Sequence, residues 1–148
     1  ITPSLAFSPG GVHYISYQNQ VTGSLSVAKY VGSGGNCDTY AAGSTGSDAW
    51  QCTVVDDQTN SVGLYSSLAF TSEGTLFVSH RGSSSGSLII SQYFGSGGNC
   101  DTYAAGSTGS DAWQCTVVDD PTAYVPLYMP LDFSLDGMPL VCHLNLYK

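Results

Sequence analysis

The sequence predicts an all-β protein with antiparallel strands, built from two four-stranded repeat units of 63 residues and a half repeat. Residues 32–57 and 95–120 are identical, and the same offset of 63 positions aligns the rest of the chain without an insertion. Short apolar stretches alternate with Gly- and Ser-rich turns, and no stretch has helical periodicity. A fixed internal offset is typical of chains made from copies of one structural unit. We therefore expect a single domain with units at 1–63, 64–126 and 127–148.

Two strands joined by a tight turn are predicted to open each unit. The turns carry a glycine at a fixed position, as Gly11, Gly74 and Gly137. Because glycine adopts positive φ at no steric cost, this recurrence indicates a left-handed backbone site in every turn. The first strands are expected at Ser4–Ser8, Ser67–Thr71 and Pro130–Ser134, and the second strands at Val12–Tyr17, Thr75–His80 and Met138–His143.

Two further strands are predicted to complete each of the full units. Leu25 and Val27 alternate with small residues, which is the pattern of a strand with two different faces. A long loop rich in Gly and Ser then leads to a strand that starts at a tryptophan. The third strands are expected at Ser24–Val31 and Ser87–Phe94, and the fourth at Trp50–Val55 and Trp113–Val118.

Four of the five cysteines fall in the duplicated block, as the pairs Cys37/Cys52 and Cys100/Cys115. No C-x-x-C motif and no nearby histidine supports a metal site, so we predict one disulfide in each full unit. A disulfide that closes a loop of this length contributes about 3 kcal/mol in the chain-entropy model. Since disulfides persist in oxidising compartments, the protein is expected to be secreted and extracellular.

The fifth cysteine, Cys142, stands at the repeat position of Ser16 and Ser79. We expect it to be a small buried strand residue. The alternative is a disulfide between molecules, which an odd cysteine in a secreted chain raises.

The composition excludes several classes of partner. Charged residues make up 9% of the chain, and three Lys and Arg stand against eleven Asp and Glu, for a net charge of −8. Nucleic-acid binding needs a cluster of cations, which this chain lacks. Its apolar runs are also far shorter than the ~18 residues of a membrane span. We expect neither nucleic-acid binding nor membrane insertion.

The first unit reads S-L-A-F…G…I-S-Y…G-S-L…A-x-Y…W-x-x-x-V-V-D. This pattern resembles the blade repeat of secreted β-propeller proteins, including some that bind sugars, and the resemblance covers essentially the whole chain. It implies blade-like four-stranded units. Two and a half units are too few for a ring of ~4–8 blades, so we expect no closed monomeric ring. The alternative is a ten-stranded β-sandwich.

The half unit carries an apolar terminal strand without a protecting charge before Lys148. Natural proteins cover or charge such edges, so we expect another strand to pair with it. The first functional hypothesis is therefore a non-enzymatic structural protein that self-assembles into a homo-oligomer, filament or surface layer. The residues of this assembly edge are Leu140, Val141, Cys142, Leu144 and Leu146.

The second hypothesis is a carbohydrate-binding, lectin-type module. Tryptophan and tyrosine rings stack on sugars while Asn and Asp bind hydroxyl groups, and such a set occurs in both copies of the block. The alternative role of the tryptophans is to pack on the disulfides. The candidate glycan contacts are Asn36, Tyr40, Asp48, Trp50, Asn99, Tyr103, Asp111 and Trp113.

Motifs for catalysis and for cofactors are missing from the sequence. It contains no G-x-S-x-G, P-loop or dinucleotide fingerprint, and no calcium-binding loop of the D-x-[DN]-x-[DN]-G type. The clustered aspartates fit turns and strand ends, where they accept local N–H groups. We expect no enzymatic activity, no catalytic residues, no cofactor and no metal.

Overall fold

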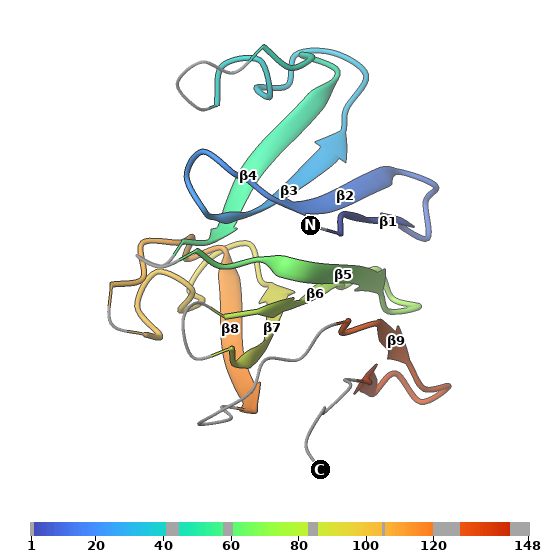
Figure 1. The fold of residues 1–148 in the computed structure, drawn as a ribbon. Helices are drawn as coiled ribbons and strands as arrows, with labels where there is room; N and C mark the ends of the chain where they lie inside the picture. The colour runs from blue at the N-terminus through green and yellow to red at the C-terminus, as the bar shows by residue number, and fades with distance from the viewer. Residues whose placement is uncertain are drawn as a thin grey trace.

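A computed structural model describes residues 2–40, 45–57, 61–82, 86–104, 106–119 and 128–142. Over these residues the protein is all-β and contains no helix, which confirms the predicted fold class (Figure 1). No helix long and apolar enough to cross a membrane occurs in the part of the chain described. The strands are β1 (Ser4–Phe7), β2 (His13–Gln18), β3 (Leu25–Tyr30), β4 (Trp50–Asp56), β5 (Leu64–Phe70), β6 (Leu76–Arg81), β7 (Leu88–Tyr93), β8 (Trp113–Asp119), β9 (Leu131–Phe133) and β10 (Pro139–Val141).

The strands form three antiparallel sheets that follow the repeat. Sheet 1 has the order β1-β2-β3-β4, sheet 2 has the order β5-β6-β7-β8, and β9 pairs with β10 in a two-stranded hairpin. The register is also repeated, because Leu5 faces Ile15, Leu68 faces Val78, and Leu131 faces Val141. Two four-stranded units and a half unit are therefore present. The described strands form three sheets instead of the two of a sandwich, and β10 pairs with β9 alone, so the alternative of a ten-stranded sandwich is wrong.

The turn that opens each unit has the predicted left-handed glycine. Gly11, Gly74 and Gly137 have φ values of 78°, 91° and 82°. An L-residue with a Cβ rarely adopts this conformation, so glycine allows the tight connection between the first and second strands of every unit.

Sheets 1 and 2 stack face to face, and the hairpin β9–β10 follows sheet 2 on its far side (Figure 1). The first strands β1, β5 and β9 lie one after another along the stack. One hydrophobic core joins the two sheets, and its fully buried members include Leu25 and Val55 of sheet 1 and Val78 and Trp113 of sheet 2. Burial of this apolar surface between the sheets is the main stabilising term of the fold.

The same contacts connect each unit to the next. The Ser4 hydroxyl accepts a hydrogen bond from the Leu68 backbone N–H at 3.0 Å, and the Ser67 hydroxyl accepts one from Leu131 at 3.0 Å. Aromatic contacts recur in the same way. The rings of Tyr14 and Phe70 lie 4.9 Å apart, and those of Phe77 and Phe133 lie 5.2 Å apart. Unit 2 therefore binds the half unit as unit 1 binds unit 2.

Both predicted disulfides are present. Cys37 bonds to Cys52 and Cys100 bonds to Cys115, with Cα–Cα distances of 5.0 and 4.9 Å. Each disulfide ties the long loop before the fourth strand to that strand. Two disulfides in a chain of this size indicate an oxidising, extracellular environment.

The expectation that Cys142 is buried is wrong, because its side chain is exposed and its thiol is free. At the equivalent positions a following unit covers the side chain. Ser16 donates a hydrogen bond to Ser66 at 2.9 Å, and Ser79 donates one to the backbone carbonyl of Met129. No described unit follows the half unit, so nothing described covers Cys142. Two residues of the predicted assembly edge, Leu144 and Leu146, lie outside the described residues.

Candidate functional site

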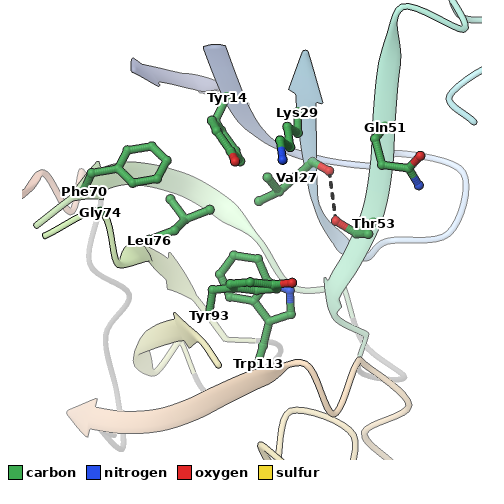
Figure 2. A pocket seen from close by; sticks show the side chains of 10 residues that line it. All are labelled: Tyr14, Val27, Lys29, Gln51, Thr53, Phe70, Gly74, Leu76, Tyr93 and Trp113. Atoms are coloured by element: carbon green, nitrogen blue, oxygen red, sulfur yellow. Dashed lines mark hydrogen bonds between the residues drawn. The ribbon is translucent and has the colours of Figure 1, made fainter. Parts of the chain in front are cut away.

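A cavity of about 340 Å³ lies between sheets 1 and 2 (Figure 2). Strands β2, β3 and β4 supply one wall, and β5 to β8 with the first turn of unit 2 supply the other. This volume is at the lower end of the range for small-molecule sites. The lining residues are Tyr14, Val27, Lys29, Gln51, Thr53, Phe70, Gly74, Leu76, Tyr93 and Trp113.

The sheet 2 wall of the cavity is mainly aromatic and apolar. Tyr93 and Trp113 meet edge to face with ring centres 5.2 Å apart, and Leu76 lies beside them (Figure 2). Trp113 is 2% exposed, so it forms the floor, whereas Tyr93 stands at the rim with 49% exposure. A ring-shaped apolar ligand would find a stacking surface here.

The sheet 1 wall carries the polar groups. The Lys29 ammonium lies 5.9 Å from the ring centre of Tyr14, at a cation–π distance. Gln51 offers an amide, while the Thr53 hydroxyl already donates to the Val27 carbonyl at 3.3 Å. The site can therefore hold a small ligand with one apolar face and polar or anionic groups on the other side.

Only one of the two predicted tryptophans belongs to this cavity. Trp113 is part of its floor, whereas Trp50 is half-buried on the face of sheet 1 that points away from sheet 2. Successive residues of a strand point to opposite faces, so the cavity receives Gln51 and Thr53 from β4 and leaves Trp50 outside. The identical block thus presents its tryptophan in two different environments.

The predicted asparagines have structural partners. The side-chain oxygen of Asn36 accepts a hydrogen bond from the backbone of Cys52 at 2.7 Å, and that of Asn99 accepts one from Cys115 at 2.7 Å. These bonds fix the disulfide loops on the fourth strands. Asp48 and Asp111 are exposed near the start of these strands, away from the cavity lining.

The predicted tyrosines also point inward, to different partners. The Tyr40 hydroxyl lies 2.9 Å from the amide nitrogen of Asn19 and 3.0 Å from the Ser26 hydroxyl. Tyr103 instead donates to a carboxylate oxygen of Asp56 at 2.6 Å, across the boundary between the two sheets. The structure therefore does not gather the eight predicted glycan contacts into one surface.

Of the residues that line the cavity, only Trp113 was predicted as a site residue from the sequence. The alternation of side chains along the strands could have identified others. Tyr14, Lys29 and Gln51 share one face of sheet 1, and that face can be assigned by strand alternation alone. The step that sequence reasoning lacked was the order of stacking, which places this face against Trp113 of the next unit.

A buried polar cluster lies near the cavity, at the boundary between the sheets. Asp56 and His80 are both 0% exposed, with a carboxylate oxygen 3.7 Å from the Nε2 atom of the imidazole. The same Nε2 lies 2.9 Å from the Ser91 hydroxyl, which in turn lies 3.2 Å from the Cys115 sulfur. The other carboxylate oxygen of Asp56 and the Nδ1 of His80 have no hydrogen-bond partner within the described structure.

This cluster has the residue types of a catalytic triad or a metal site but the geometry of neither. In a Ser-His-Asp triad the serine and the aspartate use different imidazole nitrogens, whereas Ser91 and Asp56 both approach Nε2 of His80. The donor atoms of Asp56, His80 and Cys115 lie within 4.8 Å of one another. Because Cys115 is bonded to Cys100, however, it supplies no thiolate for a metal.

Burial shifts both titratable groups of the cluster. It raises the pKa of Asp56 to about 6, although the hydrogen bond from Tyr103 opposes the shift. Burial also lowers the pKa of His80 to about 4, because the charged imidazolium is poorly solvated there. At neutral pH the interface therefore encloses an ionised carboxylate next to a neutral imidazole.

Replacing Asp56 with asparagine should change how stability depends on pH. A folded-state pKa of about 6 exceeds the unfolded value of 3.8, so protonation of Asp56 stabilises the fold below pH 3.8, and this contribution is lost as the pH rises through 6. Asp56→Asn removes it, while the opposing contribution of His80 stays. Relative to the parent, we expect D56N to lose about 2 kcal/mol of unfolding free energy between pH 7.5 and 4.5.

Urea unfolding at several pH values measures this effect. The matched control is Asp119→Asn, the same change at the equivalent repeat position, where the side chain is exposed. If the unfolding free energies of D56N and D119N had the same pH dependence, the buried carboxylate of Asp56 would not have the expected effect.

A second cavity, of about 260 Å³, lies beside the first strands of the units. Tyr65 and Tyr128, which are equivalent in the repeat, both line it with ring centres 6.0 Å apart. Both have positive φ, 55° and 71°, which costs an L-residue roughly 1–2 kcal/mol. Unlike the turn glycines, these two positions carry backbone strain in both copies.

Comparisons with protein families, with curated proteins and with solved structures found no match to this chain. The fold and the disulfides define the class of the molecule, which is an all-β repeat protein with one disulfide in each full unit.

Proposed function

We propose that this protein is an extracellular, non-enzymatic structural subunit that self-assembles through its half unit. The observation that carries the proposal is the free edge of β10, Pro139–Val141. Strands β2 and β6, which are equivalent to β10, each pair with a neighbour on both sides, whereas β10 pairs with β9 alone among the described strands. An unpaired edge offers backbone C=O groups, and N–H groups at every residue except Pro139, to a strand of another molecule.

The side chains around this edge favour association over solvation. Met138 is 61% exposed, Leu140 is 53% exposed, and the thiol of Cys142 is free. The described part of the strand carries no Lys or Glu that would keep a second strand away, and Pro139 at its start is its one edge-protecting residue. The chain also recognises copies of its own unit, because unit 1 binds unit 2 by the contacts with which unit 2 binds the half unit. The proposed partner is accordingly a second copy of the chain.

Light scattering and electron microscopy test this proposal. The parent protein should form oligomers or polymers, whereas Leu140→Lys, alone or together with Val141→Lys, should give a monomer of 15.4 kDa. A charge placed on the free edge would have to be buried without a partner in the assembly, which is costly. Val21→Lys serves as the control, because Val21 is 88% exposed in a turn of unit 1. Assembly of the double variant at the parental level would contradict the proposal.

A carbohydrate-binding module is the second candidate function, and the cavity between the sheets favours it. Tyr93 at the rim offers an exposed ring face, while Lys29 and Gln51 offer donors for hydroxyl or carboxylate groups. A monodisperse monomer that is retained on a glycan column, and is released when Tyr93 is replaced with alanine, would support this function. Polymers that are insensitive to free sugar would support the structural one.

A further inference from the structure

We propose that the partner surface of the half unit is the outer face of sheet 1 on a second copy, so that molecules assemble head to tail. This inference rests on the proposed self-assembly and assigns the contact between molecules to the sheet face of the half unit that carries Leu140, rather than to the backbone edge of β10. The surface, here called the aromatic face, consists of Phe7, His13, Tyr30 and Trp50.

The four rings of the aromatic face form a continuous row. Phe7 meets His13 edge to face at 4.9 Å, His13 stacks on Tyr30 at 5.4 Å, and Tyr30 meets Trp50 at 5.3 Å. Phe7 is 56% exposed and Tyr30 is 42% exposed. An exposed apolar row of this kind marks an interaction surface.

The repeat identifies what covers this face. The equivalent positions in sheet 2 are Phe70, Leu76, Tyr93 and Trp113. Sheet 1 packs over Phe70, Leu76 and Trp113, while Tyr93 stays exposed at the rim of the cavity. Leu76 is 5% exposed and Trp113 is 2% exposed, whereas their equivalents His13 and Trp50 are exposed and half-buried. We therefore expect the aromatic face to be covered by a sheet face equivalent to the face of sheet 1 that contacts sheet 2.

The half unit has such a face, and its register places Leu140 on it. Tyr14 is paired with Ala6, Phe77 with Ala69, and Leu140 with Asp132, so the three side chains occupy one repeat position. In units 1 and 2 this position contacts a phenylalanine of the next unit.

Among the described residues, this series of contacts leaves one member without a partner unit at each end. Tyr14 contacts Phe70, and Phe77 contacts Phe133. Leu140 and Phe7 remain, and they are 53% and 56% exposed. A second copy that placed its Phe7 on Leu140 would continue the series. Different surfaces meet in such a contact, so the assembly is heterologous and grows from both ends.

The contact between two molecules would lack one hydrogen bond that the contacts between units of one chain contain. Ser4 and Ser67 each accept a hydrogen bond from the next unit, but the equivalent residue of the half unit is Pro130, which has no hydroxyl group. We expect Pro130→Ser to tighten assembly about five-fold by providing an acceptor for the backbone N–H of Leu5 of the neighbour.

A mixing experiment tests the head-to-tail arrangement. Phe7→Lys disables the aromatic face and Leu140→Lys disables the half unit, and both replaced side chains are more than half exposed, so the fold should persist. Each variant alone should be monomeric by native mass spectrometry. An equimolar mixture should form a heterodimer and nothing larger, because each variant keeps one intact surface.

The outcomes separate this inference from the proposed function. If F7K assembles like the parent while L140K does not, the half unit acts in assembly but the aromatic face is not its partner. If L140K forms a homodimer, or if the two monomeric variants do not combine, the head-to-tail arrangement is wrong. A parent that stays monomeric at all concentrations would overturn both. Circular dichroism and the Val21→Lys control exclude effects on folding.

Discussion

Replacing Trp113 with alanine should lower the free energy of unfolding by about 3–5 kcal/mol, whereas Trp50→Ala should cost only about 1–2 kcal/mol. The two residues have identical sequence neighbours, so their intrinsic strand preferences are the same. Trp113 is 2% exposed and belongs to the core between the sheets, and its removal would leave a large cavity. Trp50 is half-buried on the outer face of sheet 1.

Urea unfolding measures both losses. The chain has two tryptophans, so each variant keeps one whose fluorescence reports on unfolding, and circular dichroism gives an independent signal. Equal losses in the two variants would mean that sheet 1 does not cover Trp113 in solution. The pair thus tests the face-to-face stacking of the units, on which the cavity and both proposals depend.

The second large effect is expected when the disulfides are removed one at a time. Both close loops with a sequence separation of 15, so the entropic part should be about 3 kcal/mol for each. Cys100 and Cys115 also belong to the core, with 0% and 3% exposure, whereas Cys37 is half-buried. We therefore expect C100A/C115A to lose about 1 kcal/mol more than C37A/C52A, because buried sulfur atoms are lost as well.

Thermal and urea unfolding of the two double variants, each with the other disulfide intact, provide the comparison. If C37A/C52A lost more unfolding free energy than C100A/C115A, the contacts of the disulfide loop in unit 1 would stabilise the fold more than the burial of the second disulfide does.

The local structure of this chain could be predicted from the sequence, for a physical reason. Strand pairing between consecutive segments depends on alternation and on turn residues, which the repeat displays three times. All ten strands were predicted, although β5 begins at Leu64 instead of Ser67 and β10 is limited to Pro139–Val141. The left-handed Gly11, Gly74 and Gly137 and both disulfides were predicted correctly. Contacts within one unit are short in sequence, so the sequence pattern determines them directly.

Contacts between units could not be predicted in the same way. Tyr40 and Tyr103 have the same neighbours in sequence, yet only Tyr103 reaches Asp56 of another unit. The exposure of Cys142 and the composition of the cavity likewise depend on which face meets which. Whether a face is covered depends on the place of its unit in the stack, and two identical blocks carry no information about that place.

The position of the disulfides also has a mechanical consequence. If the chain were pulled from its two ends, each 63-residue unit would unravel only outside the span that its disulfide closes. About 48 residues would then extend, which yields about 160 Å of length per unit, and reduction would release about 50 Å more. A fibre of such molecules would lengthen in steps whose size is set by the redox state of its surroundings.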